Sequence, residues 1–187
     1  MSVHLSEEDY RALIGDESSA PHRPDPGKAN RGKTFEATVE KICNLYKSAG
    51  EAVITYRPTE WRVQRRGQRV VSAFPVRQST LDFDGVWWGR AVAFDCKSTS
   101  RKRWFLSEMP QHQKDFLRAW VANGGLGFVL VQFKGVGVYL LPAAAVLNPD
   151  LVSFSPEELK HLRVPGEPPD FLVVVKRLLA GGVNDDH

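Results

Sequence analysis

The sequence predicts a mixed α/β domain, and two observations lead to this expectation. Segments with apolar residues at helical spacing alternate with short segments rich in β-branched and aromatic residues, in the order helix, three strands, helix, two strands and closing helices. With 187 residues, 42% of them apolar, the chain is long enough for one hydrophobic core and too short for two ordinary domains. We therefore expect a single globular domain.

The composition excludes two broad classes of protein. Ten Phe and five Trp make the chain too aromatic to be disordered. Its longest apolar run, 140–147, is far shorter than the roughly 20 residues that span a bilayer. No basic segment followed by an apolar segment comes after Met1, so we do not expect a secreted protein. Cys43 and Cys96 form neither a zinc pattern nor a Cys-x-x-Cys pair. We expect a cytoplasmic protein without membrane contact.

The chain divides into an N-terminal arm and a domain. Residues 1–29 are expected to form a flexible arm, with a capped short helix over 6–14 and a Pro-, Ser- and Gly-rich stretch over 18–28. The domain is expected over 30–187. Its first helix is predicted over 32–49, closed by Gly50, because apolar residues recur there at helical spacing, namely Phe35, Val39, Ile42 and Tyr46.

The remaining elements follow from periodicity and turn signals. Strands are expected at Ala52–Tyr56, 80–86 and 90–97, with Gly85 and Gly89 as turn candidates. A second helix is expected over 109–123, followed by a hairpin of two strands over 127–133 and 136–141. A capping box predicts a short helix over 155–162, and a closing helix is expected over 169–180.

Positive charge is concentrated in the middle of the chain. The net charge is +3, but residues 30–141 carry 18 Lys and Arg against nine Asp and Glu. Within this part, residues 57–78 have no sustained periodicity, which favours a projecting arm or β-ribbon. A charge run is often only a solvated face, but two basic blocks that flank one acidic motif favour a nucleic-acid partner. The blocks are Arg57, Arg62, Arg65, Arg66, Arg69 and Arg77 in the arm, and Arg101, Lys102 and Arg103 further on.

Two aspartates of the acidic motif are expected to face each other. If Trp88 and Gly89 form a two-residue hairpin loop, the numbers of paired residues on the two flanking strands sum to 177. Asp82 then lies opposite Asp95, with Cβ atoms about 5 Å apart. The same register places Thr80 opposite Lys97.

Directly opposed carboxylates are destabilising unless a cation compensates them. A hard divalent ion such as Mg²⁺ is the natural compensation, and a nearby ammonium such as that of Lys97 offsets charge developing on a phosphate. The ordinary alternative is an exposed hairpin with solvated acids, because Asp-x-Lys is frequent by chance. Glu36, in the first turn of the first helix, either completes the site or is a surface carboxylate favoured by the helix dipole.

Four segments together resemble the RecU family of Holliday-junction resolvases, within the PD-(D/E)XK nuclease superfamily. They are Asn30-Arg31-Gly32-Lys33-Thr34-Phe35-Glu36, residues 79–85, Phe94-Asp95-Cys96-Lys97 and His112-Gln113, and the similarity covers roughly 30–141. The resemblance implies a restriction-endonuclease-like mixed sheet flanked by helices, with a protruding basic arm, 57–78, in the place of the family's stalk.

The resemblance also implies roles for individual residues. Lys97 would stabilise the transition state, and Glu36 corresponds to the acidic residue of the family's first helix. The residues expected around Mg²⁺, or Mn²⁺ in its place, are Thr80, Asp82, Asp95 and Gln113, while Arg31 joins the two basic blocks as a DNA contact. The sequence departs from the family at three positions: it has Asp95 where the family has Glu, Leu81 where the family has Thr, and Asp84 where the family has Asn. The role of Asp84 stays open.

Together, the residues and the resemblance predict a magnesium-dependent endonuclease that cuts four-way DNA junctions by paired symmetric nicks in recombination and repair. A homodimer is expected, because two symmetric nicks need two sites, with a recombinase as a further partner. The aromatic residues Trp87, Trp88, Trp104 and Phe105 exceed what one hairpin's core needs and are, as a group, candidates for the dimer interface. Two alternatives remain open: a nuclease of the same fold that acts on other DNA structures, and a non-catalytic DNA-binding or recombinase-regulating protein.

Overall fold

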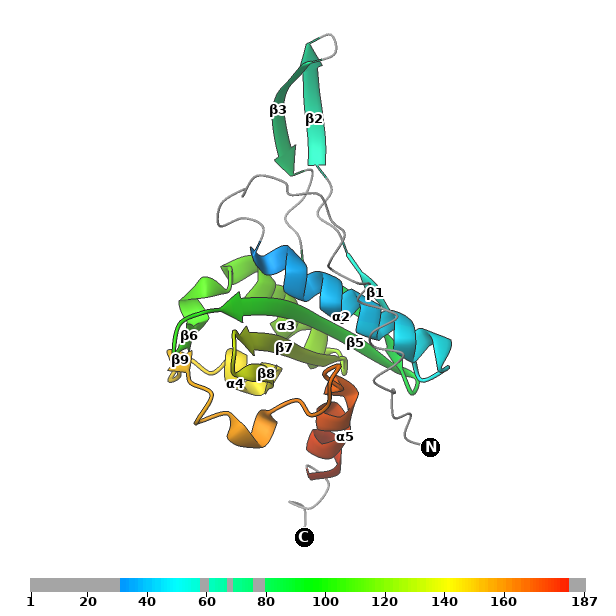
Figure 1. Ribbon diagram of the computed structural model, residues 1–187, viewed down its shortest axis with the longest axis vertical. Helices are drawn as coiled ribbons and strands as arrows, with labels where there is room; N and C mark the ends of the chain where they lie inside the picture. The colour runs from blue at the N-terminus through cyan, green and yellow to red at the C-terminus, as the bar shows by residue number, and fades with distance from the viewer. Residues whose placement is uncertain (1–30, 58–60, 67–68, 76–79, 182–187) are drawn as a thin grey trace.

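A five-stranded mixed sheet forms the centre of the computed structural model, which describes residues 31–57, 61–66, 69–75 and 80–181 (Figure 1). The strands lie in the order β1-β4-β5-β7-β8; β5 and β7 are parallel, and the other neighbours are antiparallel. This arrangement confirms the predicted mixed α/β fold class. The strands are β1 (Ala52–Tyr56), β4 (Phe83–Trp87), β5 (Arg90–Thr99), β7 (Leu126–Phe133) and β8 (Gly137–Pro142).

Helices cover the two faces of the sheet and enclose separate cores. Helices α2 (Arg31–Ser48) and α5 (Phe171–Gly181) pack on one face, where Phe94 and Phe128 are buried. Helices α3 (Gln111–Ala122) and α4 (Ala143–Val146) pack on the other, over Ala93 and Val129. No helix of the described residues is long and apolar enough to span a membrane.

The helix predicted over 32–49 is confirmed as α2, and its apolar positions have the predicted burial. The chain leaves the helix at Gly50, whose φ of 70° is readily accessible to glycine. The four apolar residues that predicted the helix are all at least 96% buried: Phe35, Val39, Ile42 and Tyr46.

The β4–β5 hairpin has the predicted register. Phe83 pairs with Phe94, and Trp87 pairs with Arg90, so the paired numbers sum to 177. The two loop residues, Trp88 and Gly89, have φ values of 48° and 73°, as a type I′ turn requires.

Two details of this hairpin differ from the prediction. Strand β4 begins at Phe83 and not at Thr80. Gly85 is not a turn residue but lies within β4, where the backbone of β1 approaches so closely that a Cβ atom would collide with the carbonyl oxygen of Val53.

The Arg-rich stretch forms a two-stranded antiparallel ribbon that is not part of the main sheet. It consists of β2 (Trp61–Arg66) and β3 (Arg69–Pro75) and projects away from the sheet and helices at the top of Figure 1. The predicted projecting arm is therefore present. The expected N-terminal arm over 1–29 and Arg77 lie outside the described residues.

The prediction of a short helix over 155–162 is wrong. The capping contact forms, with the Ser155 N–H donating to Oε2 of Glu158 over 2.8 Å, but turns and a 3-10 helix, η4 (Lys160–Leu162), follow it. The chain is then drawn to the edge of the sheet, where the Val164 N–H donates to the carbonyl of Val138. The closing helix is confirmed as α5. Among the described residues, four short elements were not predicted from the sequence: β6 (Trp104–Phe105), η3 (Leu106–Glu108), α4 and β9 (Ser153–Phe154).

Candidate active site

Two aspartates meet where β4 and β5 come together. Asp95 lies within β5 and is completely buried, while Asp82 immediately precedes β4 and is half-buried. Oδ2 of Asp82 accepts a hydrogen bond of 2.9 Å from the backbone N–H of Cys96, the residue after Asp95. The β4–β5 ladder ends at the pair of Phe83 and Phe94, so the predicted ladder pair of Asp82 with Asp95 is not formed, but the two carboxyl groups are close enough to interact directly.

Gln113 and Lys97 complete a compact polar group around Asp95. From α3, Nε2 of Gln113 donates to Oδ1 of Asp95 over 3.0 Å, and Oε1 of Gln113 accepts from Nζ of Lys97 over 3.3 Å. Nζ of Lys97 also lies 2.5 Å from Oδ2 of Asp95, an ion pair without hydrogen-bond geometry. Gln113 is 94% buried and is therefore not a solvated helix residue.

Burial and mutual repulsion perturb the acid–base properties of this group. Burial, followed by the adjacent charge of Asp95, raises the pKa of Asp82 to about 7. Burial alone would lower the pKa of Lys97, but the Asp95 carboxylate outweighs it and raises this pKa above its ordinary value. A carboxyl group that is hard to ionise beside a permanent cation is an arrangement found at functional sites.

The donor set fits a hard divalent cation. Oδ2 of buried Asp95 is ion-paired with Nζ of Lys97, but a carboxylate oxygen has two lone pairs, so it retains capacity for a further ligand. The described residues contain no cluster of three or more His, Cys, Asp or Glu side chains placed to hold a metal. An ion here would rely on the carboxylates of Asp82 and Asp95, a neutral oxygen and water, which is a set that Mg²⁺ accepts.

Glu36 and Thr80, the two further predicted site residues, have different surroundings. Glu36 on α2 is half-buried and accepts a hydrogen bond of 3.1 Å from the Tyr56 hydroxyl at the end of β1. Burial and the Glu36 charge raise the pKa of Tyr56 to about 12. Thr80 is exposed and lies outside strand β4, so the expected ladder pair of Thr80 with Lys97 is not formed.

The basic residues occupy different surroundings. Arg57, directly after β1, makes a bidentate ion pair with Asp84 on β4. Arg101 pairs with Glu108 over 3.2 Å, and Lys102 is exposed. The side chains of five other predicted DNA contacts lie outside the described part of the chain: Arg31, Arg62, Arg65, Arg66 and Arg69.

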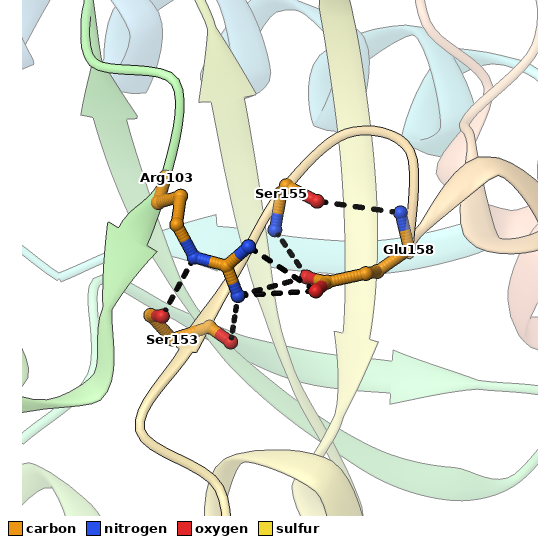
Figure 2. Close-up of polar contacts among 4 residues, drawn as sticks. All are labelled: Arg103, Ser153, Ser155 and Glu158. Carbon is orange, nitrogen blue, oxygen red and sulfur yellow. Dashed lines mark hydrogen bonds and ion pairs between the residues drawn. The ribbon is translucent and has the colours of Figure 1, made fainter.

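Arg103 connects two distant segments of the protein itself (Figure 2). Its Nε donates to the Ser153 hydroxyl over 2.9 Å, and Nη2 donates to the Ser153 carbonyl over 3.1 Å. The same guanidinium group forms 3.1 Å hydrogen bonds with the carboxylate of Glu158. These contacts give Arg103 a structural role that its place in a basic run did not indicate.

Comparison with known proteins gives consistent matches. The family model described as RecU, recombination protein U, matches residues 30–158. The chain is 32% identical over 141 residues to the Holliday junction resolvase RecU of Streptococcus sanguinis, covering 70% of each protein. It is 33% identical over 150 residues to the protein of the same name from Geobacillus kaustophilus, covering 76% of this chain and 74% of that one.

A solved structure is also similar in part. The Holliday junction resolvase Hjc of Archaeoglobus fulgidus superposes with a TM-score of 0.46 and 9% identity, over 70% of this chain and 88% of that one.

Proposed function

The chain belongs to the RecU family, and from this premise we propose that it is a metal-dependent endonuclease that resolves Holliday junctions in DNA recombination and repair. The observation that carries the proposal is the group of Asp82, Asp95 and Lys97, organised by buried Gln113. Two adjacent carboxylates and an ammonium are the residue types that phosphodiester hydrolysis with a divalent metal requires.

Each residue of the group has a proposed role. Asp82 and Asp95 would hold Mg²⁺, or Mn²⁺ in its place, with Gln113 and Thr80 as the neutral oxygen donors. When bound, such an ion polarises the scissile phosphate and lowers the pKa of a coordinated water. Lys97 would offset negative charge that develops on the phosphate. Glu36, held by Tyr56, is proposed as the further acid of the site.

The ribbon and the second basic block are proposed to contact DNA. Four arginines of the ribbon belong to this surface: Arg62, Arg65, Arg66 and Arg69. The ribbon register places Arg66 opposite Arg69, and like charges directly opposite each other favour an anionic partner. Arg101 and Lys102 would continue the contact beyond β5, whereas the internal hydrogen bonds of Arg103 support a structural role for it.

The reaction requires two copies of the site. A four-way junction is two-fold symmetric and needs two symmetric nicks, so a chain with one site is proposed to act as a homodimer. Trp87 and Trp104 are each 99% buried in the cores and are therefore poor interface candidates. Trp88, 64% exposed at the tip of the β4–β5 hairpin, and Phe105, 36% exposed, remain the aromatic candidates.

One experiment tests the proposal against both alternatives. The protein is incubated with four-way junction, duplex and flap DNA of matched sequence, with Mg²⁺ or with EDTA. We expect paired symmetric nicks in the junction alone, only with Mg²⁺, and junction binding without cleavage by Asp82→Asn. Equal cleavage of flap or duplex DNA would identify a nuclease for other structures. Binding without cleavage by the wild type would identify a non-catalytic protein.

A further inference from the structure

The position of Asp82 is not set by the strand ladder. Strand β4 begins one residue later, at Phe83, so Asp82 depends on other contacts. Two hydrogen bonds hold it: its carboxylate accepts from the Cys96 N–H over 2.9 Å, and its backbone carbonyl accepts from the Arg57 N–H over 2.7 Å. Arg57 is therefore one of the residues that fix where this carboxylate lies.

The side chain of Arg57 binds Asp84 on β4, two residues after Asp82. Its Nε donates to Oδ1 of Asp84 over 2.5 Å, and its Nη2 donates to Oδ2 over 2.5 Å. Arg57 thus contacts the main chain of Asp82 and the carboxylate of Asp84, on either side of Phe83. A bidentate guanidinium–carboxylate pair fixes direction as well as distance, which a single contact would not do.

The neighbouring residue links the same segment to the other acid. The hydroxyl of Tyr56 donates to Oε2 of Glu36, and its ring lies 5.3 Å from the ring of Phe83, centroid to centroid. The ribbon strand β2 begins four residues after Arg57, at Trp61. The root of the ribbon, Tyr56 and Arg57, is thus joined both to the strand that carries Asp82 and to Glu36.

We propose that Arg57 and Asp84 form a clamp that positions Asp82 for metal binding and ties the root of the ribbon to the cleavage site. Arg57 is then a positioning residue and not a phosphate contact, and Asp84 acts through Arg57 and not as a metal ligand. The inference rests on the proposed role of Asp82 as a ligand. Arg57 is largely exposed and Asp84 is half-buried, with side-chain exposures of 61% and 23%, and because ion pairs with one solvated partner contribute little to stability, we expect the main effect on the site.

Metal binding to the DNA-free protein distinguishes a clamp from a simple charge effect. The affinity for Mn²⁺ is measured by calorimetry for the wild type, Arg57→Ala, Asp84→Ala and the double variant. If charge alone mattered, the two single variants would change Mn²⁺ affinity in opposite directions, because loss of a cation near the site strengthens cation binding and loss of an anion weakens it. A clamp predicts that both single variants bind Mn²⁺ about tenfold more weakly. The double variant should be no weaker than either single variant, because both remove the same interaction.

The controls separate positioning from unfolding. Arg118 and Asp115 form an exposed ion pair on α3, with side-chain exposures of 55% and 56%, and Ala at either position should leave Mn²⁺ affinity unchanged. The unfolding temperature of each clamp variant should stay within about 2 °C of the wild type. If an Ala variant folds poorly, Asp84→Asn, which keeps the side-chain size, and Arg57→Gln, which keeps a polar side chain, should weaken Mn²⁺ binding in the same way.

Junction binding provides the second readout. Under the clamp, Arg57→Ala leaves the salt dependence of junction affinity unchanged, whereas a phosphate contact would reduce its slope by about 0.9 log units. The clamp would be overturned if the two single variants changed Mn²⁺ affinity in opposite directions, or if their losses of affinity added up in the double variant. A reduced salt slope for Arg57→Ala, or a wild type that binds no Mn²⁺, would also overturn it. Failure to cleave junctions while Asp82-dependent Mn²⁺ binding persists would overturn the proposed function and leave the clamp standing.

Discussion

Gln113 holds Asp95 across the boundary between helix α3 and the sheet. Its Nε2 donates to Oδ1 of Asp95 over 3.0 Å, and the Gln113 and Asp95 side chains are 6% and 0% exposed. This bond orients the whole amide, because Oε1 of Gln113 then faces the Lys97 ammonium 3.3 Å away. One neutral side chain therefore contacts two charged residues of β5, Asp95 and Lys97.

Removal of this amide should destabilise the protein. Gln113→Ala leaves a buried carboxylate oxygen without its donor, so we expect the free energy of unfolding to fall by about 1–3 kcal/mol in urea denaturation. Gln111→Ala is the matched control, since Gln111 lies two residues away on α3, is exposed and donates to exposed Asp115 over 2.8 Å. Equal losses for the two variants would contradict the positioning of Asp95 by Gln113.

Asp82 should make stability fall as pH rises. Its pKa is about 7 in the folded protein against 3.8 ordinarily, so the folded state binds the additional proton between about pH 4 and pH 7. The contribution of Asp82 to the free energy of unfolding is fully present below about pH 4 and is lost as pH rises through 7. In EDTA at pH 8, Asp82→Asn should exceed the wild type by on the order of 3 kcal/mol, as measured by urea denaturation.

This advantage should shrink toward pH 5, because Asp82 is protonated there in the folded state. Addition of Mg²⁺ at pH 8 should stabilise the wild type more than the variant, since an ion compensates the paired carboxylates. A pH-independent difference between the two proteins would refute the perturbed carboxyl group.

Loss of charge at β5 should abolish cleavage without abolishing DNA binding. Asp95→Asn should remove activity, and Lys97→Ala should slow single-turnover junction cleavage at least 10²-fold, or about 3 kcal/mol of transition-state stabilisation. Both variants should bind the junction with near-normal affinity in EDTA. Lys114→Ala on α3 is the control for Lys97. Undiminished cleavage by Asp95→Asn would exclude this carboxylate from the site.

The ribbon arginines should control how salt affects junction binding. Replacement of Arg62, Arg65, Arg66 and Arg69 by Ala should weaken junction binding and reduce the slope of log affinity against log salt by about 0.9 per lost phosphate contact. Fluorescence anisotropy over a range of salt concentrations measures this slope. Arg118→Ala with Lys160→Ala, two basic residues away from the ribbon, should leave the slope unchanged. An unchanged slope in the ribbon variant would mean that the arginines are only solvated.

The oligomeric state should depend on the exposed aromatic residues. Sedimentation of the wild type should give about 42 kDa, twice the 21.0 kDa of one chain. Combined Trp88→Ala and Phe105→Ala should shift the protein toward the monomer, whereas Trp87→Ala, in the core, should mainly destabilise the fold. A 21 kDa wild type that still makes paired nicks at nanomolar concentration would refute the dimer.

Local geometry made part of the site predictable from the sequence. The two-residue loop at Trp88 and Gly89 determines the hairpin register, whose last pair, Phe83 with Phe94, lies directly beside Asp82 and Asp95 in the sequence. Gln113 carried no comparable local signal, because its contact with Asp95 depends on how α3 docks on the sheet. Only the resemblance to a family indicated it.

Charge and capping patterns were less informative where tertiary contacts decide the outcome. Arg57 belongs to a basic run, yet it pairs with Asp84 because β1 lies beside β4, a strand pairing that the sequence does not reveal. Arg103 is engaged with Ser153 and Glu158, about fifty positions away. The segment over 155–162 has the residues of a helix start, but it forms only turns and η4. The chain then pairs with β8 through the hydrogen bond from Val164 to Val138.

The pairing of Tyr56 with Phe83 closes the base of the ribbon insertion. The chain leaves the sheet after one of these residues and returns before the other, so the ends of the insertion are held together whatever lies between them. Lengthening a loop whose ends are already joined costs little free energy, since the cost grows only with the logarithm of its length. Evolution or protein engineering could therefore exchange the ribbon as a module while the register of β4 and β5 is preserved.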